Sequence, residues 1–199
     1  MILKKEHWAL VGFTALYILT FAFYYISIGN YEFLWYVSVL VFFFLLVLFT
    51  LNKNKFDNFI LWGLSIWGLL HMSGGGIKIN GEVLYNFHLI DLINSGEIYI
   101  LRYDQFVHCF GFFVATLVVW HLLKPYLNKN SNYKIIYPLV VLGGMGLGAL
   151  NEIVEFIATV SFPGTNVGGY VNNALDLVFN TIGAIIAAVV IHIRRKQNF

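Results

Sequence analysis

The chain has 199 residues, of which 59% are hydrophobic and only 11% are charged, with a formal net charge of +2. Soluble domains carry about 25% charged residues, so this composition excludes an ordinary water-soluble globule. The single cysteine, Cys109, excludes an intrachain disulfide. The chain has no Ser/Pro-rich linker and no charge block. We therefore expect one polytopic membrane domain over residues 1–199.

The first apolar run resembles a secretory signal, because Lys4 and Lys5 precede it. The run Trp8–Ile28 is nevertheless free of charge over 21 residues, whereas the core of a signal has about 7–15. The pattern predicts a retained anchor helix.

A bilayer core accommodates about 20 apolar residues as an α-helix. Six segments are candidate spans: Trp8–Ile28, Phe33–Leu51, Asp57–Met72, Gln105–Leu123, Ile135–Val160 and Ala174–Ile193. The third has the shortest fully apolar part, Phe59–Leu70. It is therefore tilted, re-entrant or extended by its flanking residues.

The basic residues orient these spans, because cytoplasmic loops are enriched in Lys and Arg. With the N-terminus inside, six spans leave only Lys78 and Arg102 of the 12 basic residues outside. Omitting the third span would scatter the basic residues onto both sides. We therefore predict an all-α, six-helix transmembrane bundle with both termini in the cytoplasm. The basic residues assigned to the cytoplasm are Lys4, Lys5, Lys53, Lys55, Lys124, Lys129, Lys134, Arg194, Arg195 and Lys196.

The long outer loop, residues 73–103, contains a hairpin signal. Alternating apolar residues flank Asn80-Gly81, which is the usual pattern of a type I′ turn. A loop of this length is either a lid or binding element, or a solvated connector. The apolar residues that follow the hairpin are spaced for one or two amphipathic helical turns in the membrane interface: Phe87, Leu89, Ile90 and Ile93.

The fifth span carries Gly144 and Gly148, four residues apart. This small-xxx-small spacing lets helix backbones approach closely in lipid. We expect the fifth helix to be central to the bundle, with these glycines serving packing.

Polar residues inside the last three spans form pairs with helical spacing. The pairs are Asp104 with His108, Glu152 with Glu155, and Asp176 with Asn180. Residues three or four apart share one face of a helix. A charge at the bilayer centre costs about 2.5–3.5 kcal/mol, so such side chains normally face a bundle interior or a cavity.

All three pairs are predicted to lie one to two turns below the outer surface. The fourth helix enters from outside near Asp104, and the sixth enters near Asn173. The fifth runs outward, and at about 1.5 Å per residue Glu152 is roughly 25 Å along it. This layer is the candidate site. Supporting roles are expected for Asn151, Asn180 and His71, which ends the third span.

A purely structural interpretation of the layer stays open. The positive end of a helix favours Asp104 and Asp176 in first turns, but it does not explain Glu152 and Glu155, which lie far along the fifth helix. A hydrogen-bonded network of Asn, His and protonated carboxyl groups would explain all of them without a ligand.

Three blocks of the sequence resemble the YjdF-like family of bacterial inner-membrane proteins, which has no assigned activity. The blocks are residues 102–108, 151–156 and 168–184. More distantly, they are similar to the VanZ-like family, whose pattern is Asp-x-x-x-His, Glu-x-x-Gln and Asp-x-x-x-Asn-x-x-Gly. The matching residues are Asp104, His108, Glu152, Asp176, Asn180 and Gly183. Glu155 departs, because it stands where that pattern has Gln. The VanZ-like resemblance implies an envelope role touching glycopeptide resistance and fixes no reaction.

Inward-facing carboxylates and imidazoles at these spacings are how helical bundles build metal sites. Oxygen ligands with one nitrogen suit Zn²⁺, Mg²⁺, Mn²⁺ or Fe²⁺. We therefore expect an outward-facing pocket that binds a divalent metal or a cationic or amphiphilic envelope ligand. The candidate metal ligands are Asp104, His108, Glu152, Glu155 and Asp176.

Two other functions stay open. One is a metal-dependent membrane enzyme acting on an envelope lipid or lipid-linked substrate, with Glu152, His108 and Asp104 as candidate catalytic acid or base residues. The other is a structural envelope scaffold. The expected partners are the lipid bilayer and an envelope lipid or amphiphile at the outer leaflet. No nucleic acid is expected, and the sequence leaves the oligomeric state open.

Reporter fusions test the orientation. Fusions after Gly76 and Thr165 should read as extracytoplasmic, and fusions after Asn54 and Asn130 as cytoplasmic, because this arrangement keeps the basic loops inside. A cytoplasmic signal at Gly76 would remove the third span from the topology.

Overall fold

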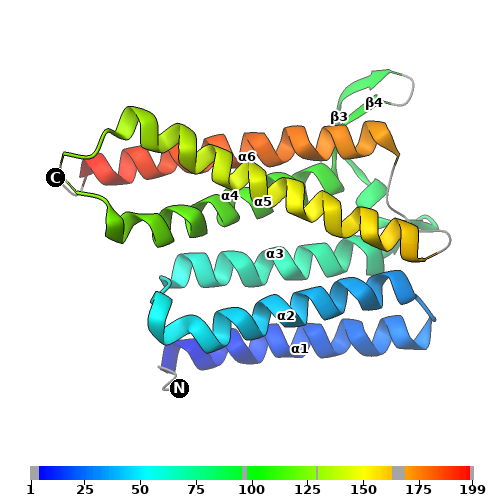
Figure 1. Cartoon of the computed structure of the whole chain (residues 1–199). Helices are drawn as coiled ribbons and strands as arrows, with labels where there is room; N and C mark the ends of the chain where they lie inside the picture. The colour runs from blue at the N-terminus through cyan, green and yellow to red at the C-terminus, as the bar shows by residue number, and fades with distance from the viewer. Residues whose placement is uncertain (1–4, 96–97, 129, 163–168, 198–199) are drawn as a thin grey trace. The chain divides into compact units, whose positions relative to one another are not determined.

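The computed structural model describes residues 5–95, 98–128, 130–162 and 169–197. The predictions made for Lys4, Lys129 and Thr165 therefore lie outside the described residues. Within them, each predicted span corresponds to one α-helix (Figure 1). The helices are α1 (Lys5–Ser27), α2 (Tyr31–Asn54), α3 (Asn58–Gly76), α4 (Tyr103–Leu123), α5 (Tyr133–Ser161) and α6 (Tyr170–Gln197). Two short 3-10 turns are η1 (Leu84–Asn86) and η2 (Lys124–Tyr126).

Local sequence sets the ends of α2 and α3. The side chain of Asn30 accepts a hydrogen bond from the backbone N–H of Phe33 (3.0 Å) and thereby caps α2. Asp57 caps α3 in the same way, through the N–H three residues further on (2.9 Å). At its other end α2 stops where Lys55 adopts a left-handed conformation and donates its N–H to the carbonyl of Leu51.

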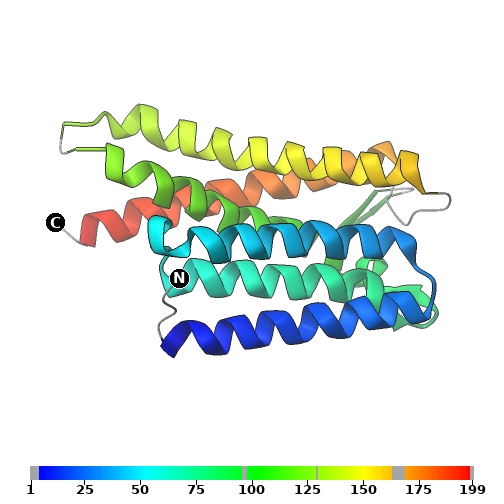
Figure 2. The same ribbon diagram turned by 60° about the horizontal axis from the view of Figure 1, so that its bottom comes forward.

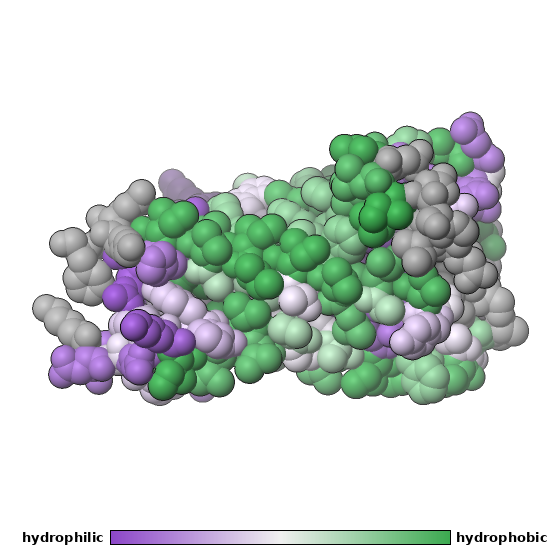
Figure 3. Space-filling model, turned by 90° about the horizontal axis from the view of Figure 1, so that it is seen from above, coloured by the Kyte–Doolittle hydropathy of each residue, from purple (hydrophilic) through white to green (hydrophobic). Residues whose placement is uncertain are grey.

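Among the described residues, five helices are long and apolar enough to cross a membrane: α1, α2, α4 together with η2, α5 and α6. The remaining helix, α3, is the one with the shortest apolar part. Large apolar side chains lie exposed along the five, for example Phe23 (70% exposed), Phe49 (73%) and Phe156 (64%). Figure 3 shows hydrophobic residues covering much of one face. An apolar surface of this extent is suited to lipid rather than to water.

A hairpin forms where Asn80-Gly81 predicts one. Strand β1 (Lys78–Ile79) pairs antiparallel with β2 (Glu82–Val83). Asn80 has a φ of 54° and Gly81 a φ of 91°, and positive φ at both central positions is the mark of a type I′ turn. The hairpin prediction is confirmed.

The amphipathic helical turns predicted after this hairpin are wrong. The segment is a strand, β3 (His88–Ser95), which pairs antiparallel with β4 (Ile98–Arg102). Isoleucines recur in both strands and favour extended backbone. An adjacent partner strand also satisfies backbone groups that a helix of one or two turns would leave unpaired.

The chain divides into two compact units. The first unit comprises Met1–Phe87 and Ile157–Asn166, and the second comprises His88–Phe156 and Val167–Phe199. In the first unit α1, α2 and α3 run side by side (Figures 1 and 2). The hydroxyls of Thr14 and Ser65 share a buried hydrogen bond (2.6 Å), and the hydroxyl of Tyr25 donates to the carbonyl of Met72 (2.5 Å). These bonds join α1 to α3. The sequence-based prediction of one domain over the whole chain stays a prediction.

In the second unit, glycines of α5 and α6 make room for parts of the neighbouring helices. A Cβ added to Gly183 of α6 would meet the backbone carbonyl of Cys109 in α4. A Cβ on Gly144 of α5 would meet a threonine of α4, and one on Gly148 would lie 2.9 Å from Nδ2 of Asn180 in α6. The two α5 glycines thus leave room for side chains of α4 and α6, as their predicted packing role requires. The fifth helix is not central, however, because the closest helix packing in this unit is between α4 and α6.

Replacing Gly183 tests this packing. Gly183→Ala should lower the free energy of unfolding by about 1–3 kcal/mol, because the added methyl group meets backbone that cannot rotate away. Gly146→Ala is the matched control in α5, since nothing lies within 4 Å of its added Cβ. Thermal melting in detergent should show a lower Tm for Gly183→Ala only. Equal Tm values for the two variants would contradict the close approach of α4 and α6.

Candidate functional site

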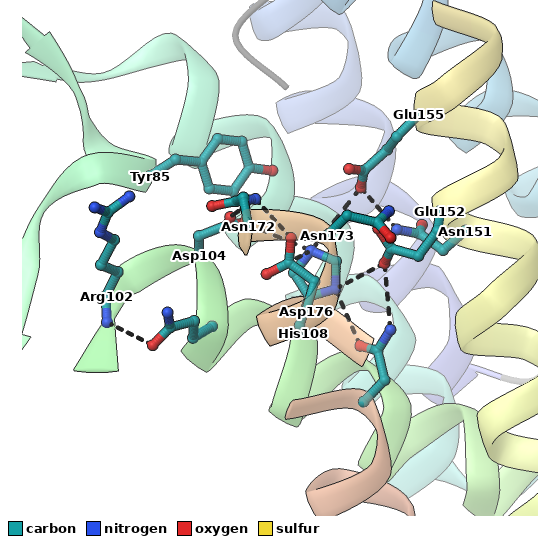
Figure 4. Close-up of polar contacts among 12 residues, drawn as sticks. Tyr85, Arg102, Asp104, His108, Asn151, Glu152, Glu155, Asn172, Asn173 and Asp176 are labelled. Carbon is teal, nitrogen blue, oxygen red and sulfur yellow. Dashed lines mark hydrogen bonds and ion pairs between the residues drawn. The ribbon is translucent and has the colours of Figure 1, made fainter. Parts of the chain in front are cut away.

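The predicted polar pairs meet at one end of the second unit, where α4 and α6 begin and α5 nears its end (Figure 4). Asp104 and His108 occupy the first turns of α4, Glu152 projects from α5, and Asp176 projects from α6. The three carboxylates each lie within 4.0 Å of the His108 ring nitrogens. The convergence of helices predicted from the sequence is therefore present in the structure.

Three carboxylate oxygens surround one nitrogen of the His108 imidazole. Nε2 lies 3.5 Å from Oδ1 of Asp104, 3.9 Å from Oε1 of Glu155 and 4.0 Å from Oδ1 of Asp176. A hydrogen bond from N–H to oxygen normally spans about 2.7–3.2 Å. The three oxygens are therefore gathered around Nε2 without any of them being hydrogen-bonded to it.

The other ring nitrogen is hydrogen-bonded to an amide. Nδ1 of His108 lies 3.0 Å from Oδ1 of Asn180, and Nδ2 of Asn180 donates to Oε1 of Glu152 at 3.3 Å. Because a carboxylate only accepts, this second bond fixes the amide with its oxygen toward the ring. With Glu152 ionised, Nδ1 therefore carries the proton, and in the neutral imidazole Nε2 presents its lone pair to the three oxygens.

Asn172, one turn before Asp176, orients both aspartates. Its Nδ2 donates to Oδ2 of Asp176 (2.6 Å) and to Oδ2 of Asp104 (3.3 Å). With their Oδ2 atoms bonded to this amide, both aspartates turn Oδ1 toward Nε2 of His108. One side chain thus sets the geometry of two carboxylates on different helices.

The glutamates of α5 are held in the same manner. Asn173 donates to Oε2 of Glu152 (2.9 Å), so both oxygens of this carboxylate accept amide hydrogen bonds. Asn151 donates to Oε1 of Glu155 (2.8 Å), as its predicted supporting role requires. Nδ1 of His108 lies 3.6 Å from Oε1 of Glu152, so this carboxylate flanks the protonated side of the ring.

Asp176 has a buried oxygen that lacks a hydrogen-bond partner among the described residues. The residue is 1% exposed, and the atom concerned is Oδ1, which faces Nε2 of His108. A buried acceptor without a partner costs about 1–3 kcal/mol, and more when it is charged. Either a proton on this carboxyl group or a positively charged ligand between Asp176 and His108 would remove the cost.

Charge balance leaves the same two alternatives. Four carboxyl groups surround one imidazole, and their side chains are only 1% to 16% exposed. Fully ionised, they would place four negative charges around this imidazole, with the Arg102 guanidinium as the other positive charge that acts on Asp176. Buried charges without partners cost so much that such a group takes up protons or coordinates a metal. Two sets of three residues could each hold an ion, because the ligand atoms within each set lie within 4.8 Å of one another. The sets are Asp104, His108 and Asp176, and His108, Glu152 and Glu155.

His71 differs from the other predicted site residues because it belongs to the first unit. Its Nδ1 is 2.6 Å from the hydroxyl of Tyr85, which also donates to the His71 carbonyl at 2.8 Å. A supporting role for His71 stays a prediction.

Sequence reasoning missed Asn172 and Asn173 as functional candidates. The signal was available, because Asn172 precedes Asp176 by four residues and Asn173 precedes Asn180 by seven. These spacings place all of them along one face of α6.

Comparison with known proteins places the chain in a family. The family described as "Predicted membrane protein (DUF2238)" matches residues 9–197. The chain belongs to this family. It is therefore a multi-pass membrane protein, in agreement with its apolar helices. No curated protein and no solved structure matches it significantly. The narrower resemblances to the YjdF-like and VanZ-like families stay predictions.

Removing one charge from the site of this DUF2238 protein should stabilise it when metal is absent. Asp176→Asn keeps the shape of the side chain and removes a buried negative charge that faces other carboxylates. The free energy of unfolding should rise by about 1 kcal/mol or more. The measurement is Tm after treatment with a chelator, with Glu82→Gln in the exposed β2 strand as the control. A lower Tm for Asp176→Asn would show that its charge already has a full set of partners.

Proposed function

We propose that this membrane protein binds one divalent metal ion between the imidazole of His108 and the carboxylates of Asp104 and Asp176, whose ligand atoms lie within 4.8 Å of one another. Glu155 belongs to the other set of three, and it would turn toward the ion to serve as a fourth ligand. The observation that carries the proposal is the set of three carboxylate oxygens around Nε2. Two ligands bound tetrahedrally to one ion at about 2.0–2.2 Å lie roughly 3.3–3.6 Å apart. Separations of 3.5–4.0 Å about Nε2 require only small side-chain movements to meet this geometry.

The hydrogen bonds around the ligands support the proposal. Histidines that bind metals usually donate their second ring N–H to an oxygen, which fixes the tautomer and the orientation of the ring. Asn180 supplies that oxygen here, and Glu152 holds the Asn180 amide in place. Glu152 is thus a positioning residue that acts on the ion through His108.

The ligand types favour particular metals. One imidazole nitrogen with three carboxylate oxygens suits Zn²⁺, Mn²⁺ or Fe²⁺. Mg²⁺ and Ca²⁺ prefer oxygen ligands throughout, and Mg²⁺ retains several waters. We therefore rank Mg²⁺ below the other three metals.

We also propose that α3 crosses the membrane as a sixth span, that both termini are cytoplasmic, and that the site faces outward in a bacterial inner membrane. The concentration of Lys and Arg in the loops assigned to the inside supports this orientation. Asp104 and Glu155 have the most exposed of the ligand side chains, at 16% and 12%. In this orientation an ion would enter past them from the outer side.

The proposal is tested by metal-dependent stabilisation of the full chain after chelation. An ion at about 100 times its Kd stabilises a folded protein by about 2.7 kcal/mol, which raises the Tm by roughly 5–10 °C. Zn²⁺, Mn²⁺ or Fe²⁺ should produce this rise, and elemental analysis should find one ion per chain. His108→Gln and Asp176→Asn should lose both effects, whereas the control Glu82→Gln should keep both.

A positioning variant sharpens the test. Asn180→Ala leaves every proposed ligand in place but removes the acceptor for the Nδ1–H of His108. Loss of such an outer partner typically weakens metal binding about 10- to 100-fold. Binding should therefore persist at saturation with reduced affinity. If none of the metals raises the Tm of the wild-type protein, the proposal is wrong and the layer is a structural network.

A further inference from the structure

The β3–β4 hairpin exposes a run of large apolar side chains. Figure 1 shows the hairpin projecting away from α6, and Figure 3 shows hydrophobic side chains gathered on a projecting part of the surface. The exposed residues are Leu89 (41%), Ile90 (57%), Leu92 (63%) and Ile93 (50%). Adjacent residues of a strand point to opposite faces, so apolar side chains lie on both faces of β3. A ribbon standing in water would normally have at least one polar face.

The base of the hairpin is fixed to a membrane span. Strand β4 ends at Arg102, and α4 begins at the next residue. The buried Gln105 accepts a hydrogen bond from the N–H of Arg102 (3.1 Å) and donates to the carbonyl of Tyr99 (2.8 Å). The hairpin is therefore held at the first turn of α4, which is one of the helices long and apolar enough to cross a membrane.

Asp91 interrupts the apolar residues of β3, and Asn94 and Ser95 end the strand. The aromatic and basic side chains lie at the base of the hairpin. The guanidinium of Arg102 lies over the ring of Tyr99 at 4.7 Å, and the rings of His88 and Tyr99 are 4.9 Å apart. Tyrosine and arginine combine an apolar body with a polar tip, and both are suited to the level of the lipid headgroups.

We propose that the β3–β4 hairpin lies in the membrane interface, with its apolar side chains inserted among phospholipid acyl chains. The unpaired strand edges set the depth. The two strands pair only with each other in the described sheet, so their outer backbone groups need water or headgroups as partners. Such groups exclude the hydrocarbon centre, whereas the boundary about 5–10 Å deep accepts apolar side chains. The hairpin is thus a lipid anchor beside the entry of α4, independent of the proposed metal.

Depth-dependent quenching tests this placement in the full-length protein. Cys109→Ser removes the single cysteine, and Leu92→Cys then allows one NBD label on the hairpin. The matched control is Asn80→Cys, in the exposed polar turn between β1 and β2. In nanodiscs, lipids with a nitroxide near the top of the acyl chain should quench the label at 92 at least threefold more than the label at 80. Aqueous iodide should show the opposite order.

Two results would overturn the proposal. Iodide quenching at 92 equal to that at 80 would mean a solvated ribbon. A blue-shifted label at 92 that neither quencher reaches, with an oxidative Leu92→Cys dimer, would mean that a second copy covers the hairpin. Ile90→Cys serves as a second labelling position if Leu92→Cys lowers the Tm, and it should give the same order of quenching.

Discussion

The burial of four carboxyl groups around one imidazole is the constraint on which the rest of the second unit depends. A bilayer offers few polar partners, so each of these groups must find one within the protein. Four asparagines supply them: Asn151, Asn172, Asn173 and Asn180 donate to carboxylate oxygens from α5 and α6. Neutral amides can orient carboxylates without adding charge, which is consistent with the number of Asn residues in the layer.

The glycines and the polar layer depend on each other, because they lie on the same helix faces. Gly183 follows Asn180 by three residues, and Gly148 precedes Glu152 by four, so each glycine shares a helix face with a site residue. Close approach at Gly183 brings α6 against α4, and close approach at Gly148 brings α5 against Asn180. Asparagine and aspartate side chains are short. These short side chains can bridge two helices only where glycines leave room for the helices to pack closely.

The sequence predicted the parts of this arrangement that depend on helical periodicity. The i/i+3 and i/i+4 spacings placed Asp104, His108, Glu152 and Asp176 on converging faces, and the Asn80-Gly81 signal located its hairpin. Periodicity does not specify which oxygen of a carboxylate an amide will hold, so the bridging role of Asn172 required the structure. The β3 strand was missed because a short apolar run fits strand and helix equally, and only pairing with β4 decides between them.

The geometry around Nε2 bears on the metal that we propose as the balancing charge. A proton on Nε2 forms a strong hydrogen bond with one acceptor within about 3.2 Å, yet the three oxygens around Nε2 stand at 3.5–4.0 Å. Three acceptors spread around a single nitrogen exceed what one N–H can serve. The proposed ion, with bonds of about 2.0–2.2 Å, would lie between Nε2 and the oxygens of Asp104 and Asp176 and contact all three atoms after small side-chain movements. The open spacing of the oxygens around His108, together with the unpaired Oδ1 of Asp176, supports this proposal over a proton on Nε2.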